Sequence, residues 1–316
     1  MSVIPVRAAR ETIGDQRRRT SRHGGLLERE GFLAYLFMMP GGLILLLFMA
    51  YPFFLGIYLS MTDKLVGFPE FSFVGLYNFR YLLQQDSVFR QTVANTFVYA
   101  FFTVPFKLVF GLGLALLLNQ SFRFSRVVRA GLLLPWIVPT AISSLGWLMI
   151  FYPVLSPISW VLKDWGLIDS NVNFLGSRFN AMASLCLANV WRGIPFFGVS
   201  ILAGLQAVPT DLHEAAALDG ASPWQRFLAV TLPVIRNIVL ITTLFSIIWT
   251  FADFQLIYVL TKGGPANTTH VFGTYAWQVG MGGTGDLGGA AAISLYMFPI
   301  LAVFAVILLR YVRSED

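Results

Sequence analysis

The chain has 316 residues, of which 56% are hydrophobic and only 12% are charged. An average soluble domain has about 25% charged residues, so this composition excludes an ordinary water-soluble protein and indicates that much of the surface lies in lipid. The net charge of +6 comes mostly from an Arg-rich N-terminal tail that includes Arg17, Arg18 and Arg19, and we expect no nucleic-acid partner from a charge placed there.

Six apolar runs are each long enough to cross a bilayer as a helix, which takes roughly 20 residues. They lie near residues 32–61, 91–118, 131–153, 181–207, 232–261 and 288–309. The runs are continuous and do not alternate with period two, so membrane β-strands are not expected. The sequence therefore predicts an all-α integral membrane protein with six transmembrane helices.

The distribution of lysine and arginine predicts the orientation. An even number of spans places both termini on one side of the membrane. The segments on that side carry 14 basic residues, against six in the segments on the other side. Because basic residues are enriched in cytoplasmic loops, both termini are predicted to be cytoplasmic.

Charged side chains also occur within the predicted spans. Such residues are costly in a membrane and usually face a bundle interior or a watery cavity. Arg192 and Asp253 are either a structural ion pair or part of a solute site. Lys107 lies near the middle of its span, too far from the ends for its stem to reach water, so we expect a partner on a neighbouring helix or subunit. Gly111 and Gly113 in the same span permit close helix approach.

Two spans carry polar and aromatic residues at the i, i+3, i+4, i+7 spacing, which places them on one helical face. These residues are Asn189, Arg192, Gly193 and Phe196 in the fourth span, and Ser246, Trp249, Thr250 and Asp253 in the fifth. Aromatic rings beside hydroxyl, amide and carboxylate groups suit a sugar or polyol. The pattern predicts that this set lines a solute path; polar packing between helices, or a site supplied mainly by a partner subunit, are the alternatives.

The segment between the fourth and fifth spans, residues 209–233, begins with signals for a short helix. Asp211 is expected as its N-cap, with Glu214 three residues later at the capping-box spacing. Asp219 and Gly220 are expected to end the helix, because glycine tolerates the left-handed conformation found there.

A second short helix is predicted directly after this break. Ser222 is expected to cap it, with Pro223 at its first position and Gln225 at its third. The pair of helices is either a rigid element that fits another protein or a connector that lies on the lipid headgroups.

The residues Glu214-Ala215-Ala216, followed by Gly220 and by Leu232-Pro233, resemble the EAA signature of permease subunits of binding-protein-dependent ABC importers. Further runs are similar to the carbohydrate-importer branch, the maltose-permease-like subunits. They are residues 189–196, 203–209 and 257–265. The resemblance extends from about residue 31 to residue 312.

This resemblance implies a type I ABC importer permease fold. The implied organisation is a flexible Arg-rich cytoplasmic tail over residues 1–30, a first transmembrane helix over 31–62, an external loop over 63–90 and a transmembrane permease core over 91–312. The coupling helices fall at about 209–230. The residues that match the family's ATPase-coupling element are Glu214, Ala215, Ala216, Asp219 and Gly220.

The implied function is that of a permease subunit of an ABC importer for a sugar or sugar-like solute in a bacterial inner membrane. Its implied partners are a second homologous permease in a heterodimer, a dimer of ATPase subunits, an external solute-binding protein and membrane lipid. The same resemblance places the two polar faces against the sugar. Arg192 and Asp253 put charges where the maltose-type site is neutral, which admits an anionic or an amino sugar.

No catalytic residue, metal site or cofactor is predicted. The chain lacks the Gly-x-x-x-x-Gly-Lys-Ser/Thr motif that cradles phosphates, so it is not expected to be an enzyme, and ATP hydrolysis must come from a separate subunit. A secondary transporter driven by an ion gradient is the alternative, but its inverted repeats are not visible. A membrane enzyme would need a nucleophile–base pair or a metal cluster within the spans, and neither is evident.

Overall fold

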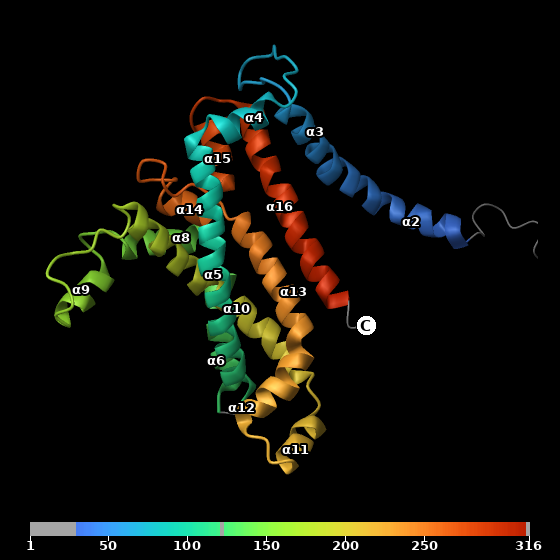
Figure 1. The fold of residues 1–316 in the computed structure, drawn as a ribbon, viewed down its shortest axis with the longest axis vertical. Helices are drawn as coiled ribbons and strands as arrows, with labels where there is room; N and C mark the ends of the chain where they lie inside the picture. Colours follow the sequence, from blue (N-terminus) through green and yellow to red (C-terminus); the bar gives the residue numbers. More distant parts are fainter. Residues whose placement is uncertain (1–29, 121–122, 314–316) are drawn as a thin grey trace, which may run out of the picture. The chain divides into compact units, whose positions relative to one another are not determined.

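The computed structural model describes residues 30–120 and 123–313. The predicted Arg-rich tail lies outside these ranges except for Glu30, where the first helix begins. The helices, shown in Figure 1, are α2 (Glu30–Leu45), η2 (Leu46–Ala50), α3 (Tyr51–Ser60), α4 (Tyr77–Gln84), α5 (Ser87–Asn119), α6 (Ser125–Leu132), α7 (Leu134–Ile137), α8 (Thr140–Ile150), α9 (Pro157–Asp164), α10 (Arg178–Gln206), α11 (Thr210–Leu218), α12 (Pro223–Arg226), η3 (Phe227–Thr231), α13 (Leu232–Phe251), α14 (Gln255–Leu260), α15 (Phe272–Trp277), η4 (Gln278–Gly282) and α16 (Leu287–Arg313).

Within the described ranges, five helices are long and apolar enough to cross a membrane. They are Leu33–Ser60, Ser87–Asn119, Arg178–Gln206, Pro223–Phe251 and Leu287–Tyr311. A sixth span is present if the two halves of a bent pair, Ser125–Ile137 and Thr140–Ile150, count as one. The all-α fold is therefore as predicted, with five candidate spans and a bent pair of helices where the third span was expected.

Pro139 explains the break in the third span. The two halves meet at an angle of 88°. The residue before a proline is pushed out of the α conformation, and Val138 is extended, with φ −63° and ψ 129°. Hydropathy alone cannot detect this bend, because both halves are apolar.

The fifth span differs from its predicted limits of 232–261. Its helix starts earlier, at Pro223, and runs through the π-helical turn η3 into α13. It ends at Phe251, and the chain passes through three non-helical residues before the short helix α14 begins at Gln255. The sequence reads as one span because α14 is also apolar.

The chain divides into two compact units, residues 1–56 and 57–316. The described part of the first unit is the helical segment formed by α2, η2 and the start of α3, with Pro40 inside α2. Together with the end of α3 it forms the first candidate span.

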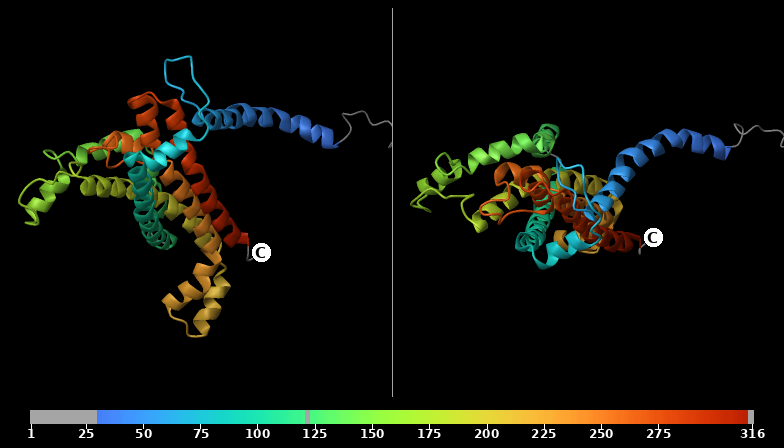
Figure 2. Two further views of the ribbon diagram at one scale, coloured as in Figure 1. Left: turned by 45° about the horizontal axis from the view of Figure 1, so that its top comes forward. Right: turned by 90° about the horizontal axis from the view of Figure 1, so that it is seen from above.

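In the second unit, α5, α10, α13 and α16 form a helical bundle (Figures 1 and 2). Large side chains with essentially no exposure fill its interior, among them Tyr99, Phe197 and Phe251. Helices α5 and α10 approach closely at Gly111, where a Cβ atom would lie 2.3 Å from Cβ of Phe197. Close approach is thus confirmed at Gly111 but not at Gly113, where a Cβ atom would have nothing within 4 Å.

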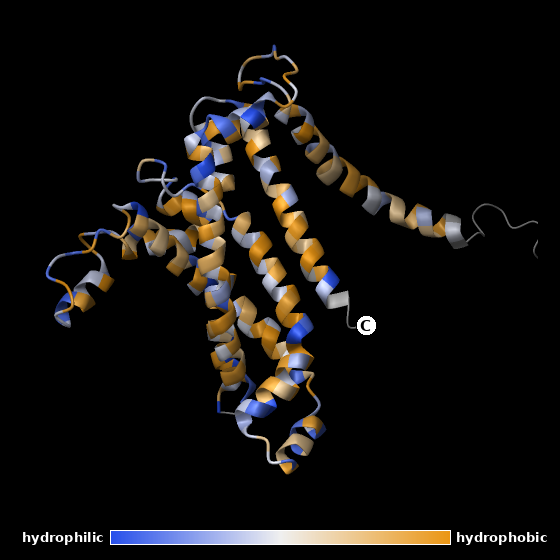
Figure 3. Ribbon diagram, viewed as in Figure 1, coloured by the Kyte–Doolittle hydropathy of each residue, from blue (hydrophilic) through white to orange (hydrophobic). Residues whose placement is uncertain are grey.

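The two ends of this bundle carry different elements. Helices α11 and α12 lie at one end, and α4 and α15 lie at the other (Figure 1). Figure 3 shows hydrophobic residues along the bundle helices and more hydrophilic residues toward the segments at the ends. The end of α5 lies near α12, since both line one cavity with His213 of α11.

Candidate functional site

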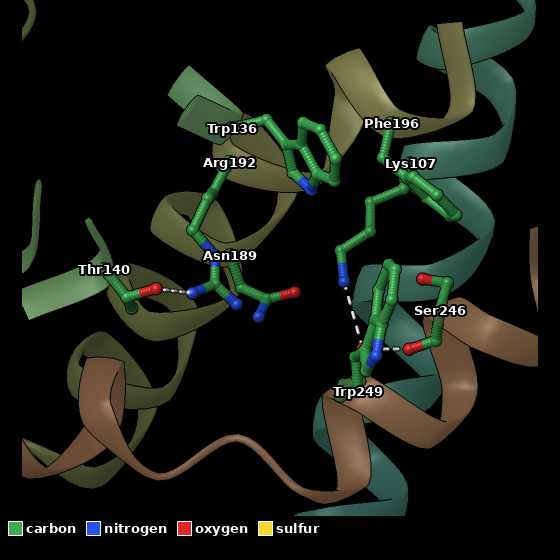
Figure 4. A pocket seen from close by; sticks show the side chains of 10 residues that line it. Lys107, Trp136, Thr140, Asn189, Arg192, Phe196, Ser246 and Trp249 are labelled. Atoms are coloured by element: carbon green, nitrogen blue, oxygen red, sulfur yellow. Dashed lines mark hydrogen bonds between the residues drawn. The ribbon is translucent and has the colours of Figure 1, made fainter. Parts of the chain in front are cut away.

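A cavity of about 220 Å³ lies in the bundle between α5, α10 and α13, beside the broken third span. Figure 4 shows its lining side chains. They are Lys107, Trp136, Thr140, Asn189, Arg192, Gly193, Phe196, Ser246, Trp249 and Thr250. Seven of the eight residues predicted to line a solute path are among them, so the faces of α10 and α13 do meet at one place.

Asp253 is the exception. It was predicted to share a helical face with Ser246, but α13 ends at Phe251, so Asp253 lies in the connection to α14 and does not line the cavity. It is buried, at 6% exposure. Its Oδ2 atom accepts hydrogen bonds from the Tyr99 hydroxyl and from Nδ2 of Asn189, both at 2.8 Å. Asp253 therefore lies outside the cavity lining and orients the Asn189 side chain, which does line it.

Arg192 reaches the cavity from α10. Its guanidinium donates a hydrogen bond to Oγ1 of Thr140 on α8. A second guanidinium nitrogen is 3.9 Å from Oδ2 of Asp253, which is long compared with the 2.7–2.9 Å of a strong charge-assisted hydrogen bond. The ion pair considered from the sequence is thus present but loose, and the Arg192 side chain remains 23% exposed.

Lys107 crosses the cavity from α5 and is 5% exposed. Its ammonium donates to Oγ1 of Thr250 at 3.0 Å, which confirms the expected partner on a neighbouring helix. The Lys107 stem passes over Gly193, where a Cβ atom would lie 2.6 Å from Cδ of Lys107. The absence of a side chain at Gly193 is therefore what lets the ammonium reach this place.

Aromatic rings form another part of the cavity wall. Trp136 of α7 is stacked on Phe196, with ring centroids 6.0 Å apart. Phe196 in turn meets Trp249 edge to face at 4.8 Å. Such rings can pack against the C–H surface of a sugar.

Sequence reasoning did not place Lys107, Trp136 or Thr140 in the solute site. Lys107 carried a usable signal, an intramembrane charge in a predicted span. Trp136 and Thr140 carried none, because they belong to the two halves of the bent span and only the 88° bend brings them to α10.

Asn189 has an unsatisfied acceptor at the cavity. The residue is 2% exposed, and its Oδ1 has no hydrogen-bond partner among the described residues. Figure 4 shows the oxygen of the Asn189 amide turned toward the side of the cavity from which Lys107 enters. A buried polar atom without a partner costs about 1–3 kcal/mol, so a ligand that donates a hydrogen bond here would be favoured.

The segment after α10 forms a second candidate site. Helix α11 ends at Leu218, with Asp219 as its C-cap, followed by Gly220 with φ +77°. The N–H groups of Gly220 and Ala221 donate to the carbonyls of Ala217 and Ala216 at 3.1 and 3.0 Å. These two bonds form a Schellman motif, so the predicted helix end is confirmed.

The predicted start of α11 is wrong. Pro209 occupies the N-cap position and Thr210 is the first helical residue, so Asp211 lies in the first turn and makes no capping bond. The capping box with Glu214 does not form. Asp211 still carries a negative charge at the helix N-terminus, which the helix dipole favours.

The predicted start of the second helix is confirmed. The Ser222 hydroxyl accepts from the N–H of Gln225 at 3.3 Å, and the Gln225 side chain accepts from the N–H of Ser222 at 2.8 Å. However, α12 is not a separate short helix, because it continues through η3 into α13. A displacement of α12 would therefore be transmitted directly to the span that lines the cavity.

The α11–α12 element is open to contact. Glu214, Ala215, Asp219 and Gly220 are exposed, and Ala216 is half-buried. Large apolar side chains on the same element are exposed too: Leu218 at 90%, Trp224 at 67% and Leu212 at 46%. Exposed apolar side chains gathered on one element are typical of a protein contact surface.

Comparison with known proteins gives consistent results. The family model described as "Binding-protein-dependent transport system inner membrane component" matches residues 107–314. The trehalose/maltose transport system permease protein MalF of Thermococcus litoralis is 34% identical over 285 residues, which cover 90% of this chain and 95% of that protein. The sulfoquinovosyl glycerol transport system permease protein SmoG of Agrobacterium fabrum is 32% identical, with 90% and 91% covered.

A solved structure shares the fold. It is that of a bacterial alginate ABC transporter in complex with an alginate pentasaccharide-bound periplasmic protein. Its similar chain superposes with a TM-score of 0.77 at 21% identity, covering 90% of this chain and 94% of that chain. The helices described above therefore have the arrangement of an importer permease.

Proposed function

The chain belongs to the family of binding-protein-dependent transport system inner membrane components, and from this premise we propose that it forms one half of a translocation path for a sugar or sugar-like solute. As a family member it is a multi-pass inner-membrane permease subunit of an ABC importer, and a separate subunit hydrolyses ATP. The observation that carries the proposal is the cavity at which the polar faces of α10 and α13 meet.

The chemistry of this cavity supports a sugar. Trp136, Phe196 and Trp249 offer ring faces and edges, and the free acceptor of Asn189 and the hydroxyl of Ser246 offer hydrogen bonds to hydroxyl groups. Relatives named for trehalose/maltose and for sulfoquinovosyl glycerol agree with this class. The proposed solute-contacting residues are Asn189, Arg192, Gly193, Phe196, Ser246, Trp249 and Thr250, with Asp253 as a supporting residue.

The size of the cavity supports a second permease. Small-molecule sites usually measure roughly 300–1,000 Å³, and this one measures about 220 Å³. A homologous permease packed against this chain as a heterodimer would supply the opposite wall. An external solute-binding protein would deliver the sugar, as the periplasmic protein in the alginate complex carries its pentasaccharide.

The α11–α12 element is proposed to dock on the ATPase dimer. The residues assigned to this role are Glu214, Ala215, Ala216, Asp219 and Gly220. Their exposure and the exposed apolar side chains Leu218 and Trp224 fit a protein interface. The continuous helix from α12 to α13 then converts closure of the ATPase dimer into movement of Trp249 and Thr250 at the cavity.

The orientation is proposed from the positive-inside rule. The bundle end that carries α11 and α12 would face the cytoplasm of a bacterial cell, and the end that carries α4 and α15 would face outward. This places the proposed ATPase contact on the side where ATP is available.

Transport tests the proposal. The chain, its partner permease, the ATPase and the binding protein are reconstituted in proteoliposomes, and sugar uptake is measured with ATP or with ion gradients. Uptake with ATP alone is expected. Uptake driven by a gradient without ATP would instead identify a secondary transporter.

Two matched pairs of variants assign the sites. On α11, Glu214→Gln is expected to reduce ATP-coupled uptake, whereas Asp211→Asn on the same helix is not. Within the cavity, Trp249→Ala is expected to reduce uptake, whereas Trp160→Ala on the exposed helix α9 is not. If the two variants of a pair reduce uptake equally, the role assigned to Glu214 or to Trp249 is wrong.

A further inference from the structure

The charges at the cavity do not balance among the described residues. Two cations, Lys107 and Arg192, line it, and one carboxylate, Asp253, lies behind it. A buried charge without a partner is unfavourable, because burial removes the water that would stabilise it. The site therefore favours a ligand that brings a negative charge.

The carboxylate of Asp253 is already engaged. It accepts hydrogen bonds from Tyr99 and from Asn189, each at 2.8 Å. Its distance to the Arg192 guanidinium is 3.9 Å, so it makes no close hydrogen bond with that cation. Asp253 thus pairs loosely with Arg192, and Lys107 has no carboxylate within hydrogen-bond distance among the described residues.

The ammonium of Lys107 has unused donors. Its hydrogen-bond partner among the described residues is the neutral hydroxyl of Thr250, whereas an ammonium has three N–H groups. Thr250 cannot neutralise the charge, because its hydroxyl is uncharged; that hydroxyl donates its own proton to the carbonyl of Ser246 at 2.7 Å. An anionic oxygen beside Lys107 would supply both a hydrogen bond and a counter-charge.

The acceptor of Asn189 requires a different group. An anion cannot donate a hydrogen bond to this Oδ1, but a hydroxyl can. The cavity thus offers cationic donors, an unpaired acceptor and aromatic rings within about 220 Å³. A sugar with a hydroxyl and an acidic group on one ring meets all three.

We propose that this cavity binds sugars that carry a carboxylate, sulfonate or phosphate group, with Lys107 and Arg192 holding the anion and Oδ1 of Asn189 accepting from a hydroxyl of the same sugar. This inference rests on the proposed sugar-lining role of the cavity. It also decides against an amino sugar, because a third cation would face Lys107 and Arg192.

Calorimetric binding to the transporter complex tests the inference. The complex of both permeases with the ATPase is embedded in nanodiscs without the binding protein, whose own selectivity would mask that of the cavity. The probes are methyl β-glucuronide, methyl β-glucoside, which lacks the carboxylate, glucosamine and inorganic phosphate. The glucuronide is expected to bind at least about ten-fold more tightly than the glucoside, as hydrogen bonds to charged groups imply.

Variants assign that preference to residues. Lys107→Met and Arg192→Gln are each expected to reduce glucuronide affinity by at least about ten-fold and to reduce the affinity for the glucoside by less, so that the preference for the glucuronide shrinks. Lys163→Met on the exposed helix α9 is the control and should leave both affinities unchanged. If Lys107→Met does not assemble, Arg192→Gln and the comparison of ligands on the unaltered complex decide.

The opposing results separate the two proposals. A glucoside or glucosamine that binds as tightly as the glucuronide, or a preference that survives both substitutions, overturns the anionic class and leaves a sugar site standing. The sugar-lining role itself is overturned if neither the glucoside nor the glucuronide binds. It is also overturned if inorganic phosphate binds as tightly as the glucuronide.

Discussion

Replacing Gly111 by alanine tests the contact that holds α5 against α10. A Cβ atom at this position would lie 2.3 Å from Cβ of Phe197, 3.2 Å from the backbone nitrogen of Gly198 and 3.3 Å from the carbonyl oxygen of Ile194. Carbon atoms prefer separations of about 3.5–4.0 Å. None of these neighbours is the flexible end of a side chain, so the two helices must move apart.

The magnitude follows from a matched variant two residues away. Gly113→Ala places its Cβ in open space and gains up to about 1 kcal/mol of helix propensity. Gly111→Ala gains the same propensity but adds the cost of overpacking, about 1–3 kcal/mol. The difference between the two variants therefore isolates the steric cost.

Thermal denaturation of the purified chain in nanodiscs measures this difference. At about 2–4 °C per kcal/mol, Gly111→Ala is expected to melt roughly 2–12 °C below Gly113→Ala. Equal melting temperatures would show that α5 and α10 are not in contact at Gly111, and the position assigned to Lys107 one turn earlier would lose its support.

Three further predictions concern single positions. Gly193→Ala should push the stem of Lys107 away from Thr250 and reduce ATP-coupled uptake; unchanged uptake would contradict this. Gly220→Ala should strain the left-handed turn by about 1–2 kcal/mol and weaken ATPase co-purification, whereas Gly220→Asn, which tolerates that conformation, should be milder. Burial lowers the pKa of His270, in the loop before α15, to about 4. The unfolded chain, with a histidine pKa near 6.5, then binds more protons, so the melting temperature should fall as the pH falls from about 6.5 to about 4, and His270→Gln should flatten that dependence.

The positions of the membrane spans were largely predictable from the sequence. Continuous apolar runs identify the spans, because side chains that face lipid must be apolar however the helices pack against one another. The Gly220 turn and the Ser222 cap were also predictable, since both depend on backbone conformation and on bonds between residues a few positions apart.

The ends of the spans were less predictable. Hydropathy extended the fifth span to residue 261, but the helix ends at Phe251. The third span reads as straight and is bent at Pro139. In both cases the runs on the two sides of the break are apolar, so mean hydropathy merges them into one span, although Pro139 and Asp253 lie at the breaks.

The sequence by itself determined that this chain spans a membrane, that α10 and α13 each carry a polar face, and that charges lie within its spans. Only the tertiary structure decided that Lys107, Trp136 and Thr140 line one cavity together with those faces. It also decided that Asp253 lies outside the lining, where it accepts a hydrogen bond from Asn189. The reason is physical: helical periodicity relates residues on one helix, whereas the contacts between helices depend on where a glycine permits close approach and where a proline bends the chain.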